Sequence, residues 1–156
     1  MLPSHQLYYP HRYLRFMPEK YYFDTCIWRD HYENRFGTGG RPLGEIATRA
    51  FLKLMKENKP ILFSEFNVGE MTRDYPEQEI NNMLNLLFKA GKIKRVVITK
   101  SDVEEAKKLS RERGVSFGDC LHAVLARNSN AILITQNVKD FEQLADIVDF
   151  RKPEHI

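Results

Sequence analysis

Tyr21-Tyr22-Phe23-Asp24-Thr25 is the stretch that decides the fold, a short apolar run that ends on an aspartate. Such a run is typical of a strand that is buried in a sheet. A carboxylate at its end must be solvated, cap the next segment or hold a cation, because burying a charge without a partner is costly. We therefore expect a buried strand over Tyr21–Asp24 with an acid at its carboxyl end.

The rest of the chain alternates between strand-like and helix-like segments. Further strands are predicted at Pro60–Phe63, Arg95–Thr99, Ala131–Thr135 and Ile147–Phe150. The predicted helices run from Pro42 to about Lys56, from about Glu65, from Pro76 to a stop at Gly91, from a capping box at Ser101–Glu104 to before Gly114, over Ser116–Asn128 and over Phe141–Ala145. This alternation predicts an α/β fold with a parallel sheet of four to five strands, covered on both faces.

Length and composition narrow the class of protein. The 156 residues are 42% hydrophobic and 29% charged, which fits one globular domain with a single core. No apolar run nears the roughly 20 residues of a membrane span, and the N-terminus lacks the apolar segment of a secretory signal. Cys26 and Cys120 have no metal-type spacing and are expected to be buried in a reducing cytosol. We therefore expect a cytoplasmic protein without membrane contact.

Residues 1–20 differ in composition from the rest, since they mix tyrosines with histidines and arginines. Two interpretations stay open: an arm for single-stranded RNA, or a tail docked on the domain. Met17 is an alternative start, because the patterned part begins at Tyr21. The net charge of +3 permits a polyanionic partner. The predicted organisation is an N-terminal extension over residues 1–20 and a domain over residues 21–153.

Three acids downstream occupy places similar to that of Asp24. Glu70 comes a few residues after the second predicted strand, Asp119 lies one turn into a predicted helix, and Asp140 follows the fourth predicted strand. Ligands of parallel α/β sheets bind outside the carboxyl ends of the strands, so these four acids can converge. Carboxylate oxygens suit hard divalent cations, and the pattern therefore points to a metal site.

Asp24 and Asp119 also have structural interpretations. Asp24 can cap the helix that follows it, and Asp119 stands at capping-box spacing from Ser116. His122 lies three residues after Asp119 on the same predicted helical face. It either contacts a phosphate or acts in proton transfer, or it packs at the edge of the core.

Glu70 and Asp140 each have a competitor nearby. Glu70 can lie on a solvated helix face, with Glu65 as the inward acid in its place. Asp140 can support a helix dipole while Asn137 takes the inward position. Other chemistries have no support, because the sequence contains no strand–GxxxxGK[ST] loop, no G-x-S-x-G, no H-E-x-x-H and no zinc-type spacing. The separate carboxylates are the one constellation that remains.

Four segments resemble, in their order and spacing, the PIN-domain ribonucleases, a family that includes the toxins of VapBC toxin–antitoxin pairs. These segments are Tyr22–Trp28, Phe63–Met71, Phe117–Ala126 and Ile132–Phe141. The resemblance implies a three-layer α/β/α sandwich around a parallel sheet. It also implies cleavage of RNA with Mg²⁺ or Mn²⁺ as the cofactor.

The resemblance assigns roles to the acids. Asp24, Glu70 and Asp119 match the first, second and third acids of the family, and the distance in sequence from Ser64 favours Glu70 over Glu65. At the position of the fourth acid, the sequence departs from the family. Many members carry Asp where this chain has Asn137, so Asp140 takes over or Asn137 serves as a neutral ligand.

The predicted function is that of a metal-dependent endoribonuclease that hydrolyses RNA phosphodiester bonds, with a toxin of a toxin–antitoxin pair as a subclass. The predicted catalytic and metal-binding residues are Asp24, Glu70, Asp119 and Asp140, with Asn137 as a further metal ligand. The predicted partners are an RNA substrate, an antitoxin protein and a second copy of the chain in a homodimer. The alternative is a catalytically weak PIN-fold module that binds RNA or protein, and Asn137 motivates it.

Overall fold

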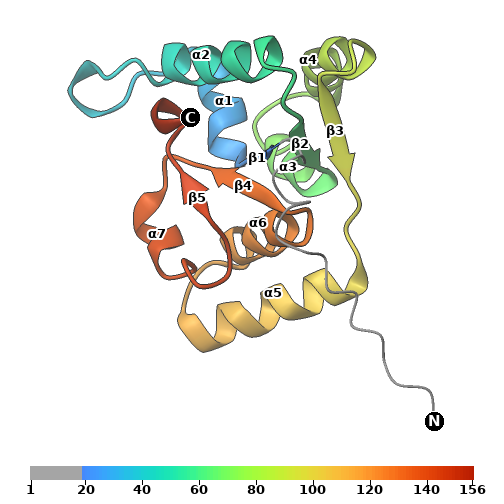
Figure 1. Ribbon diagram of the computed structural model, residues 1–156, viewed down its shortest axis with the longest axis vertical. Coiled ribbons are helices and arrows are strands. Elements are labelled where there is room, and N and C mark those ends of the chain that lie inside the picture. Colours follow the sequence, from blue (N-terminus) through green and yellow to red (C-terminus); the bar gives the residue numbers. More distant parts are fainter. Residues whose placement is uncertain (1–18) are drawn as a thin grey trace, which may run out of the picture.

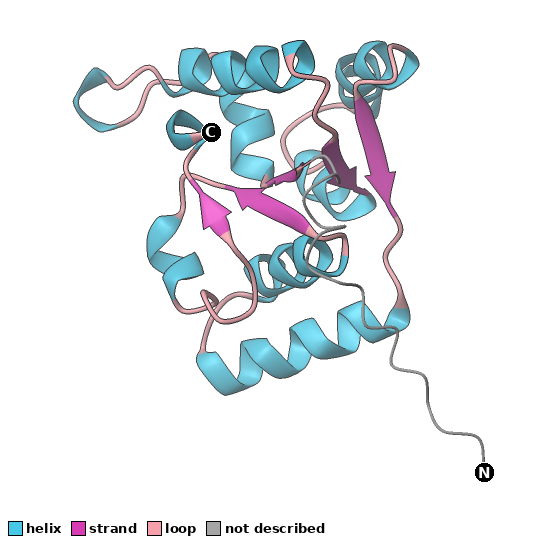
Figure 2. Ribbon diagram, in the orientation of Figure 1, coloured by secondary structure: helices cyan, strands magenta, loops and turns pink. Residues whose placement is uncertain are grey.

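A five-stranded parallel sheet between two layers of helices forms the core of the computed structural model, which describes residues 19–156 (Figure 1; Figure 2). The strands are β1 (Lys20–Phe23), β2 (Ile61–Ser64), β3 (Ile93–Val96), β4 (Ala131–Ile134) and β5 (Phe150–Arg151). They lie in the order β3-β2-β1-β4-β5, and all neighbours are parallel. The predicted three-layer α/β/α sandwich is confirmed.

The helices divide between the two faces of the sheet (Figure 1). One face packs against α1 (Thr25–Glu33), α2 (Leu43–Lys56) and α4 (Glu77–Lys89), and the other against α5 (Lys100–Arg113), α6 (Phe117–Asn128) and α7 (Val138–Glu142). The remaining elements are α3 (Glu65–Met71) and the short 3₁₀ turns η2 (Thr38–Gly40) and η3 (Pro153–His155). The three central strands β1, β2 and β4 therefore have a hydrophobic layer on both sides.

The aromatic run in β1 reflects this double burial. Tyr21 and Phe23 pack into the cluster under α1 and α2, whereas Tyr22 packs into the cluster under α5 and α6. All three side chains are at most 1% exposed. Because successive side chains of a strand point to opposite faces, a strand buried on both faces needs bulky residues at every position.

The strand order places a crevice at the end of β1. The chain builds β2 and β3 on one side of β1 and then crosses over to build β4 and β5 on the other. The loops that leave β1 and β4 therefore diverge, which is where ligands of such sheets bind. The Asp24 N–H donates to the Ile134 carbonyl at 2.9 Å and holds the two strand ends side by side.

The third predicted strand is wrong by two to three residues. It was expected at Arg95–Thr99, but β3 ends at Val96, in register with Ser64 of β2, and Val97 is 78% exposed. Thr99 is instead the N-cap of α5, where its hydroxyl accepts from the Asp102 N–H and its own N–H donates to the Asp102 carboxylate. The capping box lies at Thr99–Asp102 and not at Ser101–Glu104.

Two boundaries near the C-terminal end also differ from prediction. Helix α7 begins at Val138 and not at Phe141, because Asn137 is its N-cap residue. Strand β5 covers Phe150–Arg151 and not Ile147–Phe150, because it pairs with Leu133 and Ile134 of β4. The N-cap residue therefore sets the start of α7, and pairing with β4 sets the bounds of β5.

Residues 1–18 lie outside the described residues, and with them the interpretations as an RNA-binding arm or a docked tail and of Met17 as a start. The division into an extension over 1–20 and a domain over 21–153 stays a prediction. Within residues 19–156, no helix combines the length and hydrophobicity that a bilayer crossing requires.

Gly44 allows α2 to approach α1 closely. A Cβ at this position would lie 2.7 Å from the backbone carbonyl carbon of Asn34, far inside normal contact distance. We expect Gly44→Ala to destabilise the fold by about 1–3 kcal/mol, because one helix must shift. Urea denaturation measures this change. Gly69→Ala is the matched control, since a Cβ at this helical position meets nothing within 4 Å, and it should stabilise by roughly 0.5–1 kcal/mol.

Candidate active site

Asp24 lies directly after β1 and is only 6% exposed. Its Oδ2 accepts a hydrogen bond from the Thr135 hydroxyl at 2.7 Å and lies 3.4 Å from the thiol of Cys26, which is half-buried and free. Its Oδ1 lies 3.7 Å from Nε2 of His122. Asp24 occupies the N-cap position of α1, but its carboxylate is committed to these three partners.

Glu70 is the inward acid of α3. Its Oε1 accepts hydrogen bonds from the Thr25 hydroxyl at 2.9 Å and from Nε2 of His122 at 2.6 Å. Burial alone would raise the pKa of Glu70, but the hydrogen bond and charge of His122, with help from Thr25, outweigh it and hold the pKa below its ordinary value. Glu65 lies instead on the surface, where it pairs with Arg95 at 2.8 Å.

Asp119 is half-buried in the first turn of α6. The Ser116 hydroxyl caps this helix by accepting from the Asp119 N–H at 3.2 Å. Burial raises the pKa of Asp119 to about 6, and the charges of Asp24 and Asp140 act in the same direction. Crowding of carboxylates raises their pKa in this way, and a cation placed among them would relieve the repulsion.

Asn137 and Asp140 form one unit at the start of α7. The Asn137 side-chain amide donates to Oδ2 of Asp140 at 2.8 Å. The Asn137 N–H donates to the Thr135 hydroxyl at 2.9 Å, and this hydroxyl in turn donates to Asp24. Asp140 therefore supplies a negative charge near Asp119, while Asn137 orients it and links it to Asp24.

His122 lies at the centre of these groups and is 1% exposed. Burial would lower its pKa, but the Glu70 hydrogen bond and the charges of Asp24, Glu70 and Asp119 outweigh burial and raise the pKa. The sequence leaves His122 open between a site contact and a core residue, and the structure combines both. Thr25 and Thr135 also border the site, and sequence reasoning missed both. The available signal was their position, because Thr25 directly follows Asp24 and Thr135 directly follows the last residue of β4.

The donor chemistry of the site fits a hard divalent cation. Oxygen ligands from Asp24, Glu70 and Asp119 are the type that Mg²⁺ and Mn²⁺ prefer. Within residues 19–156, however, no group of three or more His, Cys, Asp or Glu side chains already has the spacing to enclose a metal ion. Nε2 of His122 lies 3.7 Å from Asp24 and 2.6 Å from Glu70.

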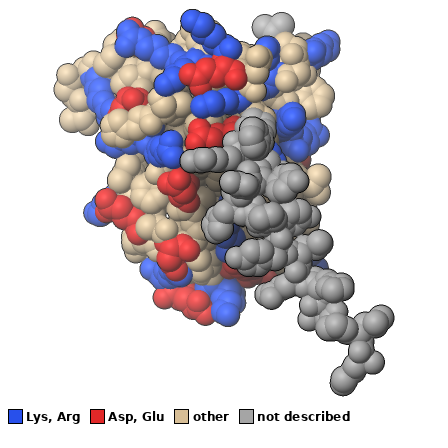
Figure 3. Space-filling view, in the orientation of Figure 1, with Lys and Arg blue, Asp and Glu red and all other residues tan. Residues whose placement is uncertain are grey.

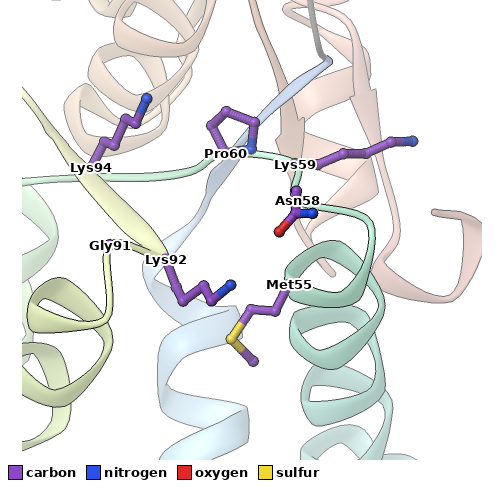
Figure 4. A pocket seen from close by; sticks show the side chains of 7 residues that line it. All are labelled: Met55, Asn58, Lys59, Pro60, Gly91, Lys92 and Lys94. Carbon is purple, nitrogen blue, oxygen red and sulfur yellow. The ribbon is translucent and has the colours of Figure 1, made fainter.

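The opposite edge of the sheet has a different character. A hollow of about 170 Å³ lies at the amino ends of β2 and β3, and Lys59, Lys92 and Lys94 are among its lining residues (Figure 4). Figure 4 shows the side chains of Lys92 and Met55 pointing toward each other, whereas Lys59 points away. On the face seen in Figure 3, Lys and Arg side chains gather mainly in the upper half, where α2 and α4 lie. The lysine-lined hollow does not suit a cation.

The fold and the site define an α/β protein with acids gathered at the switch point of a parallel sheet. The family profile described as PIN domain matches residues 21–147. The chain belongs to the PIN domain family. A sequence comparison with curated proteins gives no match.

Similar solved structures come from bacterial toxin–antitoxin complexes. A chain of VapBC2 from Rickettsia felis, bound to a DNA fragment from its promoter, has a TM-score of 0.60 at 17% identity, over 85% of this chain and 97% of that one. A chain of VapBC-1 from nontypeable Haemophilus influenzae has a TM-score of 0.60 at 18% identity, over 85% and 97%. A toxin–antitoxin complex from Klebsiella pneumoniae gives 0.59 at 20% identity, over 86% and 98%. These similarities show a shared fold.

The raised pKa of Asp119 predicts a pH-dependent cost of its charge. Because the folded-state pKa of about 6 exceeds the ordinary value of 3.8, the folded protein holds this proton more tightly, and stability is lost as pH rises through about 6. In EDTA, Asp119→Asn should raise the melting temperature by roughly 2–4 °C more at pH 8 than at pH 4.5, after allowance for solvent screening. Glu65→Gln is the surface control. An equal effect of Asp119→Asn at both pH values would contradict the raised pKa of Asp119.

Proposed function

We propose that this chain is an endoribonuclease that hydrolyses RNA phosphodiester bonds with Mg²⁺ or Mn²⁺. The observation that carries the proposal is the gathering of Asp24, Glu70 and Asp119 around His122, at the crevice beside the end of β1. PIN domains are generally nucleases that use divalent metal ions, which supports the same conclusion.

The residues of the site have distinct proposed roles. Asp24 and Asp119 are the direct metal ligands, and Asp140 serves a second position. When bound, the metal would lower the pKa of a water and neutralise charge on the phosphate and the leaving oxygen. Thr135 holds the Asp24 carboxylate in one orientation, and Thr25 and His122 do the same for Glu70. Fixed acids lose little conformational entropy when they bind a cation.

Asn137 favours a second candidate, a PIN-fold module that binds RNA or a protein with little or no cleavage. The amide at this position is neutral and bound to Asp140, so one negative charge is missing relative to many family members. A weaker second metal position would follow, because ligand charge sets affinity for hard cations.

Loss of the Asp24 charge should remove nearly all RNA cleavage. We expect Asp24→Asn to reduce kcat/KM on single-stranded RNA by roughly 100-fold or more, because a metal-binding charge is worth several kcal/mol in the transition state. EDTA should abolish wild-type cleavage, and Mg²⁺ or Mn²⁺ should restore it. Glu65→Gln, on the same sheet edge but paired with Arg95 at the surface, should cleave normally. Unchanged turnover by folded Asp24→Asn protein would refute the metal mechanism.

Asp140 and Asn137 should differ in importance. Asp140 carries the charge that acts on Asp119, whereas Asn137 only orients it. Asp140→Asn should therefore lower the cleavage rate and Mn²⁺ affinity more than Asn137→Ala does. Isothermal titration with Mn²⁺ and single-turnover cleavage measure both effects. If neither variant changes the cleavage rate or the Mn²⁺ affinity, a second metal position is excluded and the binding module becomes the favoured function.

We further propose an antitoxin partner and a cytoplasmic location. Chains of this fold in VapBC complexes are paired with an antitoxin, which supports the proposal. Expression of the chain should arrest bacterial growth, and the product of a neighbouring gene should relieve the arrest. Asp24→Asn should be harmless when expressed at the same level. Arrest by the Asp24→Asn variant would exclude cleavage as its cause. A homodimer stays a prediction for light scattering to test.

A further inference from the structure

Polar side chains from five elements meet in the interior behind Glu70. They are at most 4% exposed: Tyr22 of β1, Thr25 of α1, Ser64 of β2, Asn67 of α3 and His122 of α6. Buried polar groups are stable only when they are hydrogen-bonded. Here they bond to one another and to the Glu70 carboxylate, and aromatic rings close off one side, with Phe66 5.0 Å from the His122 ring.

One arm of this network reaches Glu70 through Asn67 and Thr25. The Ser64 N–H donates to Oδ1 of Asn67 at 2.8 Å, which fixes the orientation of the amide. The amide nitrogen then donates to the Phe23 carbonyl at 3.2 Å and to Oγ1 of Thr25 at 2.9 Å. Because Thr25 accepts this bond, its own proton is directed to Oε1 of Glu70.

The other arm reaches the same oxygen through His122. An ionised carboxylate only accepts hydrogen bonds, so Nε2 of His122 carries the proton it shares with Glu70 at 2.6 Å. Nδ1 of His122 pairs with the Tyr22 hydroxyl at 2.8 Å, and this hydroxyl pairs with the Ser64 hydroxyl at 2.8 Å. The Ser64 hydroxyl lies 3.4 Å from Oδ1 of Asn67, where the first arm begins. The two arms therefore close into a circuit.

The circuit treats the two oxygens of Glu70 differently. Both hydrogen bonds that the described residues make to this carboxylate go to Oε1. Oε2 lies toward the first turn of α6, since a Cβ added at Gly118 would be 3.7 Å from it. Gly118 directly precedes Asp119, so Oε2 lies near the turn of α6 that carries the next acid.

We propose that this circuit is a positioning device, in which Tyr22, Thr25 and His122 hold Glu70 so that Oε2 alone is offered to the cation. The inference rests on the proposed function for the cation itself. It assigns Glu70 a one-oxygen contact and makes the three residues positioning residues. Removal of a residue that hydrogen-bonds to a metal ligand typically weakens metal affinity by about 10–100-fold.

The first experiment needs no metal. Tyr22→Phe and Thr25→Val each remove one hydroxyl from opposite arms, and the melting temperatures of both single variants and the double variant are compared in EDTA. The double variant should lose clearly less than the sum of the single losses, because one break already disrupts the circuit. Thr48→Val is the control partner for Tyr22→Phe, since Thr48 bonds to His31 outside the circuit, and this pair should be additive.

The second experiment measures Mn²⁺ binding by electron paramagnetic resonance without RNA. Tyr22→Phe and Thr25→Val should each weaken binding by about 10–100-fold. Thr25→Ser, which keeps the hydroxyl, should bind within about twofold of wild type. Val124→Ala, buried on α6 outside the circuit, should lower the melting temperature without changing Mn²⁺ affinity. In a Glu70→Gln background the circuit variants should cause no further loss.

Additive melting losses for Tyr22→Phe and Thr25→Val would overturn the circuit. Non-additive losses with unchanged Mn²⁺ affinity would overturn its positioning role. If wild-type protein bound no Mn²⁺ at all, the proposed function would fail, while non-additive losses in EDTA would still support the circuit as the group that holds Glu70.

Discussion

The burial of the Asp24 carboxylate is the constraint on which the rest of the site depends. An ionised group that is 6% exposed at the end of a central strand is costly unless partners compensate it. Thr135 from the end of β4 and His122 from α6 provide that compensation. These partners are available only because the strand order reverses beside β1 and brings β4 next to it. The reversal of the strand order beside β1 therefore determines both the arrangement of the sheet and the position of the site.

Glu70 and Asp119 show how two carboxylates of one site acquire opposite properties. The pKa of Glu70 lies below its ordinary value, although burial opposes this, because His122 and Thr25 donate hydrogen bonds to it. The pKa of Asp119 is raised to about 6, because burial and neighbouring acids dominate. Environments that push pKa values apart are a feature of working sites, since one group stays charged while the other can exchange a proton.

The two edges of the sheet are electrostatically distinct. The carboxyl edge gathers acids around His122, whereas the amino edges of β2 and β3 border a hollow with three lysines. A polyanion such as RNA is repelled by metal-free carboxylates and attracted by basic surfaces. Under the proposed function, a cation held at the carboxyl edge would offset the charge of the acids and so weaken their repulsion of a phosphate.

The sequence by itself determined the alternation of strands and helices and the four acids, because periodicity and acids at strand ends are local signals. It also located the helix stop at Gly114, whose φ of 66° favours glycine. The end of β3 at Val96 and the place of β5 required the register with neighbouring strands. The resemblance to PIN-domain ribonucleases favoured Glu70 over Glu65, but only the tertiary structure showed Glu70 as the inward acid, and it alone gave His122 its partners. These depend on contacts across 45 or more residues of sequence, such as Thr25 with Glu70, which no local pattern encodes.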